Sequence, residues 1–137
     1  MKYMLMIFGK QSDYDAMGGD GTHGPAWTDK DTAAMFAFMR SVNEDLTASG
    51  EMVDGQGLSE PSQARLVTAK DDGVPVISDG SYGETKEVLA GYWVLDCESI
   101  ERATEIAARV YGCPQPEGAP NYPVVVRPIP DGAGIEM

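Results

Sequence analysis

The hydrophobic residues of this chain fall into short runs and longer periodic segments, which together predict an α+β protein. Six short segments, the first and fifth of them strongly apolar, are bounded by Gly, Pro, Ser or Asp, as is typical of β-strands. An Asp-Asp-Gly turn between the third and fourth segments favours a hairpin at that point. The six expected strands cover residues 2–9, 51–58, 64–70, 74–78, 88–95 and 122–129.

Residues 29–49 have the clearest helical pattern in the sequence. Thr28 is placed to cap the start, and Gly50 stands where a helix ends in a left-handed residue. Asp29 and Asp31 fall in the first turn, where negative charge is favourable near the helix dipole. One apolar stripe runs along the segment at helical spacing, and it consists of Met35, Phe38, Met39, Val42 and Leu46.

A second helix is expected over residues 99–111, with Ser99 as its cap and Gly112 as its end. Its inward face is predicted to carry Ile100, Ala103, Ala107 and Val110. Between these elements, residues 10–27 have no period and are rich in Gly and Asp. We interpret them as a long flexible loop, either a lid over a site or a mobile segment.

The order of these elements predicts a ferredoxin-like split βαβ fold with a hairpin inserted in the middle. Each helix connects two strands of one sheet, and right-handed crossovers place both helices on the same face. A length of 137 residues suits one domain with a core of its own, so residues 1–137 are expected to form a single domain.

The second face of the sheet is apolar as well, which predicts a partner. A sheet with one wet face alternates apolar and polar residues, but the first and fifth strands are apolar on both sides. Leaving such a face in water would lose several kcal/mol of stabilisation, at about 25 cal/mol per Å² of apolar surface that stays unburied. It would also make the protein prone to aggregate. We therefore expect a homodimer through the sheet face. In the first strand Tyr3, Leu5 and Ile7 point to one face and Met4, Met6 and Phe8 to the other; in the fifth, Tyr92 and Val94 lie opposite Trp93 and Leu95.

Composition and charge argue against several classes of function. The net charge is −12, with 22 acidic and 10 basic residues, so binding to nucleic acid or to an anionic membrane is not expected. No apolar run near the start has the length of a signal peptide or a membrane span, which indicates a cytoplasmic protein. Cys97 and Cys113 have no metal-type spacing and are expected to be reduced and partly buried.

Motifs for cofactors and metals are missing from the sequence. The Gly-rich residues 18–21 lack the preceding turn and following helix of a dinucleotide fingerprint, so no cofactor is expected. The acidic residues around His23 match no recognised ligand spacing, so no metal is expected.

The candidate site residues come from the loops and the aromatic positions. His23 is the only histidine, and as a general base it would be oriented by Asp79 or Asp54. The alternatives are a solvated loop residue for His23 and a turn-forming residue for Asp79. A ligand cleft between sheet and loop would be lined by Tyr3, Trp27, Asp54, Tyr82, Glu84, Lys86 and Trp93, although aromatic residues at such positions more often belong to a core or an interface.

Residues 78–87, Ser-Asp-Gly-Ser-Tyr-Gly-Glu-Thr-Lys-Glu, and the Leu-Ala-Gly-Tyr of 89–92 resemble the signature of the YCII-related proteins called DGPF-domain proteins. Residues 2–7, 49–51, 55–58 and 126–129 are also similar to that family. Ser81 and Tyr82 replace the Pro-Phe of its signature. The resemblance implies a dimeric α+β barrel, and in more distant members a His–Asp pair in a cleft, with the His near the start of the first helix. His23 lies several residues before that helix.

Two functions follow from these residues. The first is a regulatory dimeric module that binds a small molecule or a partner. The second is a cofactor-free enzyme of isomerase, lyase or hydrolase type, in which His23 and Asp79 act as acid and base.

Overall fold

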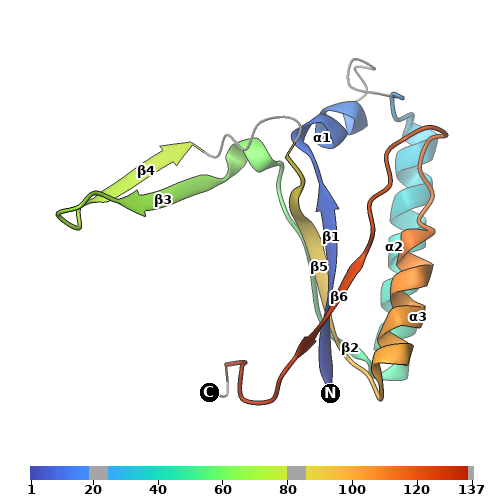
Figure 1. Cartoon of the computed structure of the whole chain (residues 1–137). Coiled ribbons are helices and arrows are strands. Elements are labelled where there is room, and N and C mark those ends of the chain that lie inside the picture. The colour runs from blue at the N-terminus through green and yellow to red at the C-terminus, as the bar shows by residue number, and fades with distance from the viewer. Residues whose placement is uncertain (19–24, 80–85, 136–137) are drawn as a thin grey trace.

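Four antiparallel strands form the main sheet, in the order β2-β5-β1-β6 (Figure 1). The computed structural model describes residues 1–18, 25–79 and 86–135. Because β5 separates β1 from β2 and β1 separates β5 from β6, the strands that each crossover connects are parallel but not adjacent. A split βαβ arrangement requires this order. The strands are β1 (Lys2–Gly9), β2 (Met52–Gly57), β5 (Val88–Asp96) and β6 (Val125–Ile129).

Two helices, α2 (Asp29–Ser49) and α3 (Ile100–Tyr111), lie against one face of this sheet (Figure 1). The predicted caps are confirmed: the Thr28 hydroxyl accepts the Asp31 N–H at 3.1 Å, and Gly50 has φ 80°. Ser99 caps α3 by accepting the Arg102 N–H. Although α2 has 21 residues, no helix in the described part of the chain combines that length with the apolarity that a membrane span needs.

The core lies between the helices and the sheet, and its composition corrects one expectation for α3. Ile106 is 4% exposed, whereas Ile100, predicted to point inward, is 40% exposed. Ile100 is the first residue of the helix and lies at the edge of the buried arc, so fewer side chains cover it. Both cysteines are free, as expected, with Cys97 buried in this core. The fully or nearly buried apolar residues are Tyr3, Leu5, Val42, Leu46, Trp93, Leu95, Cys97, Ala103, Ile106, Ala107 and Val110.

The expected hairpin is confirmed as β3 (Arg65–Ala69) and β4 (Pro75–Asp79), which form a separate two-stranded sheet. It projects from the molecule on the side opposite α2 and α3 (Figure 1). Val67 and Ile77 pair across its strands and are 66% and 65% exposed. We call residues 65–79 the arm.

Residues 10–27 contain a helix, so the prediction that all of them form a loop is wrong. Helix α1 spans Gln11–Met17. Its first turn is closed by the Lys10 N–H, which donates to Asp13 Oδ2 at 2.8 Å. Contacts with distant residues also hold it: Gln11 Oε1 accepts the Ser62 N–H at 2.9 Å, and the Tyr14 hydroxyl donates to the Leu58 carbonyl at 3.2 Å.

A bidentate ion pair joins the end of α2 to the start of α3. Arg102 Nε and Nη2 each donate to a Glu51 carboxylate oxygen at 2.9 Å. The hydrogen bonds and charge of Arg102, with a further hydrogen bond from Ser49, lower the pKa of Glu51 from its usual 4.5 to about 2. Because the folded pKa lies below the unfolded value, Glu51 stabilises the native state above about pH 4.5, and this contribution is lost as the pH falls toward 2.

We expect the Glu51→Gln variant to be less stable than wild type by about 1 kcal/mol at pH 6. This value is small because the Arg102 side chain is 38% exposed and solvent screens the pair. The difference should shrink toward zero between pH 4.5 and pH 2, measured by urea denaturation at each pH. Glu117→Gln, at an exposed loop carboxylate, is the control and should show no such trend. A difference that stays constant down to pH 2 would contradict the assignment.

Candidate functional site

A cavity of about 450 Å³ lies at one end of the sheet, where several elements meet. Its walls come from the ends of β1 and β5, from α1, from the first half of α2, and from the segment between α3 and β6. Its volume is in the range typical of small-molecule sites. The apolar side chains of the wall include Ile7, Phe8, Met17, Trp27, Met35, Phe36, Met39, Val110 and Val124.

Small residues at this end of the sheet keep the space open. Gly9, Gly57 and Ala90 line the cavity with at most a methyl group. The neighbouring Gly91 has a separate reason to be glycine, because a Cβ there would lie 2.9 Å from the Gln56 carbonyl oxygen. β2 and β5 therefore approach closely, and nothing large from either strand fills the volume beyond them.

Asp13 and Tyr14 from α1 and Tyr122 from the segment before β6 form one polar wall of the cavity, and Tyr111, Gln115 and Asn121 also belong to the lining. The Tyr14 hydroxyl donates to the Leu58 carbonyl at 3.2 Å and approaches the Ala90 carbonyl at 3.5 Å. A hydrogen bond joins the Tyr122 phenol to the Asp13 carboxylate. Segments that are far apart in the sequence thus meet at this wall.

Two phenols and one thiol of the lining, those of Tyr14, Tyr122 and Cys113, are held in their neutral forms. Burial raises the pKa of Tyr122, and its hydrogen bond to Asp13 raises that pKa further. Burial together with the negative charges of Asp13 and Glu60 raises the pKa of Tyr14. Burial also raises the pKa of the Cys113 thiol. A thiolate or phenolate nucleophile needs a lowered pKa, whereas these pKa values are raised. At neutral pH these groups therefore serve as hydrogen-bonding or apolar surface.

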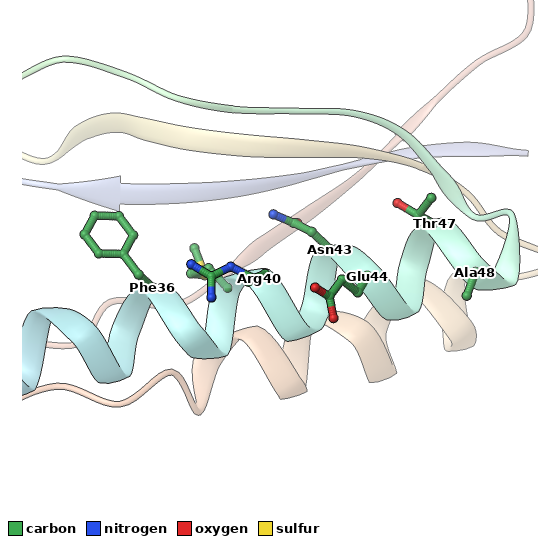
Figure 2. A pocket seen from close by; sticks show the side chains of 7 residues that line it. Phe36, Arg40, Asn43, Glu44, Thr47 and Ala48 are labelled. Carbon is green, nitrogen blue, oxygen red and sulfur yellow. The ribbon is translucent and has the colours of Figure 1, made fainter.

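A shallow groove runs along the exposed side of α2 (Figure 2). Figure 2 shows Phe36, Asn43 and Thr47 on the edge of the helix toward the strands, with Glu44 and Ala48 turned away from them. All seven residues that line this groove belong to α2, so it does not surround a ligand. Phe36 and Met39 line both the groove and the cavity.

A second groove, of about 550 Å³, lies between α2 and β2 and contains two of the predicted site residues, Asp54 and Trp93. The Asp54 carboxylate accepts the Tyr92 hydroxyl at 3.3 Å. Trp93 donates from Nε1 to the Asn43 Oδ1 at 2.8 Å, and its ring packs over Gly55. The first hydrogen bond links β5 to β2 and the second links β5 to α2, so both residues have a structural role.

The other predicted site residues are not brought together. Trp27 lines the cavity, but Tyr3 lies in the core, where its hydroxyl contacts the Met1 sulfur at 3.7 Å. Asp79 ends the arm, where its 88% exposed side chain forms an ion pair with Arg65 at 2.7 Å. Lys86 is exposed two residues before the start of β5. His23, Tyr82 and Glu84 lie outside the described residues, so the predicted pairing of His23 with Asp79 stays a prediction.

Asp13, Tyr14, Cys113 and Tyr122 were not predicted from the sequence as parts of a site. The first two were placed in a loop, and Tyr122 was assigned to a strand that in fact begins at Val125. A weak signal for α1 exists, since Tyr14 and Met17 have helical spacing and are followed by Gly18. Across the residues that can be described, no three His, Cys, Asp or Glu side chains lie close enough to hold a metal ion.

Comparison with known proteins identifies the family. Over 82 residues the chain is 26% identical to an uncharacterised protein, R00369, of Rhizobium meliloti (strain 1021). The aligned part makes up 60% of this chain and 65%, less than two thirds, of that relative. The family model of the YCII-related domain matches residues 1–125. This match extends over most of the sequence and confirms the resemblance seen in its motifs, so the chain belongs to the YCII-related domain family.

Proposed function

We propose that this protein is a homodimeric regulatory module that binds a small molecule in the cavity between α1, α2 and the end of the sheet. The observation that carries the proposal is the cavity itself: about 450 Å³, apolar on most sides, with Asp13, Tyr14 and Tyr122 converging on one wall. Binding sites for small molecules commonly combine an apolar lining with a few placed polar groups.

Binding has more support than catalysis. An acid/base group works best with a pKa near the operating pH, but the pKa values of Tyr14, Cys113 and Tyr122 are all raised away from neutrality. The enzyme alternative relied on Asp79, which is exposed and paired with Arg65 outside the cavity lining. We therefore place the ligand at the cavity and assign no reaction.

The homodimer is proposed to form through the open face of the sheet, with two sheets closing into an α+β barrel of ferredoxin-like subunits. Met4, Met6, Tyr92 and Val94 are only half-buried, and α2 and α3 cover the opposite face. Strands of 8, 6, 9 and 5 residues span about 450 Å² in projection, at about 3.3 Å per residue and 4.8 Å between strands. This is of the same order as the roughly 800 Å² of accessible area that each partner of a stable complex buries.

The arm supports the same assembly. A two-stranded hairpin alone in water is marginally stable, and this one exposes Val67, Val74 and Ile77. It projects on the side of the open sheet face (Figure 1), so a second copy that covers this face would also meet the arm. In a two-fold dimer each arm would cover the partner in the same way, which explains why apolar residues are retained at its surface.

The ligand-binding function is tested with Trp27 as the reporter, because Trp27 lines the cavity and Trp93 does not. In Trp93→Phe, Trp27 is the only remaining tryptophan. We expect the neutral probe 1-naphthalenemethanol to change its emission saturably. At about ten times Kd, binding should stabilise the protein by about 1.4 kcal/mol and raise Tm by roughly 4 °C.

The matched control is Trp27→Phe, in which Trp93 alone emits. Its emission should stay constant in the presence of the probe. An unchanged emission and Tm in Trp93→Phe, or equal changes in both variants, would contradict binding at this cavity.

A further inference from the structure

The polar wall of the cavity consists of hydrogen-bond acceptors whose own donor hydrogens are already engaged. A carboxylate only accepts, so in the Tyr122–Asp13 hydrogen bond the phenol is the donor. The Tyr14 hydroxyl gives its hydrogen to the Leu58 carbonyl at 3.2 Å. The phenol oxygens therefore offer lone pairs to a ligand, and the Asp13 carboxylate keeps free lone pairs beyond those used by Tyr122 and the Lys10 N–H.

Positive charge is missing from the same lining. None of the described residues that line the cavity is Lys, Arg or His. The ammonium of Lys10 lies 5.7 Å from the centre of the Tyr122 ring and is not part of the lining. A carboxylate ligand entering this space would lose its hydration without gaining a charged partner, whereas an ammonium would meet the Asp13 carboxylate.

The apolar part of the cavity suits an aromatic or branched body. Phe8, Trp27 and Phe36 provide ring surfaces, which attract cations as well as apolar groups. Met17, Met35 and Met39 provide flexible side chains that adapt to different shapes. An engineered apolar cavity of about 150 Å³ holds one benzene, so about 450 Å³ accommodates a body of roughly two rings with a polar substituent.

We propose that the cavity selects small molecules with an aromatic or apolar body and a hydrogen-bond donor, with a primary ammonium as the preferred donor, and rejects carboxylates. This inference rests on the proposed ligand-binding function and adds the chemical class of the ligand. Asp13 is the residue that sets the preference, because it is the one carboxylate among the described residues of the lining.

Three probes that share one ring system and differ in their charge test the proposal: 1-naphthylmethylamine, 1-naphthalenemethanol and 1-naphthoate. Affinities are measured by isothermal titration calorimetry at pH 7. We expect the amine to bind at least tenfold more tightly than the naphthoate, with the alcohol between them. Asp13→Asn keeps an oxygen that accepts the Lys10 N–H but removes the charge. It should abolish most of the difference between amine and naphthoate, with the affinity of the alcohol almost unchanged.

Asp45→Asn is the matched control, because it removes one carboxylate charge from the surface, where Asp45 pairs with Arg109 at 2.8 Å. It should leave the preference for the amine intact. If all three probes bind equally and Trp27 reports each of them, the ligand-binding function stands and the proposed selectivity is overturned. If none of them binds or changes Trp27 emission, both are overturned. Equal loss of selectivity in Asp45→Asn would assign the preference to net charge instead of Asp13.

Discussion

Ile106→Ala is expected to lower the free energy of unfolding by about 3 to 4 kcal/mol, whereas Ile100→Ala should lower it by less than about 1 kcal/mol. The two substitutions remove the same atoms from the same helix. Ile106 is buried between α3 and the sheet, so its truncation leaves a cavity in a packed core. Ile100 already meets solvent, so its truncation removes little buried surface.

The free energy of unfolding of both variants and of wild type is measured by urea denaturation at one protein concentration, with circular dichroism as the signal. A loss of 3 to 4 kcal/mol is a large share of the roughly 5 to 15 kcal/mol that stabilises a typical domain. Similar losses for the two variants would mean that α3 is rotated about its axis relative to the sheet. The pattern of the sequence placed Ile100 and not Ile106 on the inward face, so this comparison tests the packing in the structure.

The elements with strong local signals could be predicted from the sequence. Helix α2 has a capping Thr28, a terminal Gly50 and a continuous apolar stripe, and its bounds agree with the structure. The central strands have uninterrupted apolar runs, and the turn at 71–73 identified the arm. In each case the residues that fix the element lie within the element or beside it.

Helix α1 could not be predicted for a physical reason. It has seven residues, and so short a helix is marginal in water on its own. Its stability comes from Ser62 and Leu58, which are more than 40 residues away and which bond to Gln11 and Tyr14. These contacts cannot be inferred from the local sequence, which is rich in Gly and Asp.

The cavity escaped prediction for the same reason. Asp13 and Tyr122 come from opposite ends of the chain and meet only because β1 and β6 are neighbours in the sheet. Conversely, Asp79 was expected at a cleft because of its motif, but the register of the arm pairs it with Arg65. Sequence motifs thus indicated the family correctly, while the location of the site depended on tertiary contacts.

Met6→Asp is expected to convert a homodimer at micromolar concentration into monomers. Met6 lies in the centre of the open sheet face, where its strand neighbours are Tyr92 and Val125. The two-fold symmetry of the proposed dimer buries two new carboxylates in one interface, where each must lose its hydration. We expect the dissociation constant to increase at least a hundredfold. Sedimentation equilibrium should give twice the chain mass of 14.7 kDa for wild type and the single mass for the variant.

Two further variants separate the sheet face from a general effect of charge and from the arm. Ala108→Asp adds the same charge on the exposed side of α3 and should remain dimeric. Val67→Thr with Ile77→Thr keeps residues that favour strands but reduces the apolar surface of the arm, so we expect a dimer weakened about tenfold. A monomeric wild type, or a Met6→Asp dimer of unchanged affinity, would contradict the sheet-face assembly. If only the arm variant weakens the dimer, the subunits meet through the arm. The open sheet face would then remain exposed to solvent in the dimer.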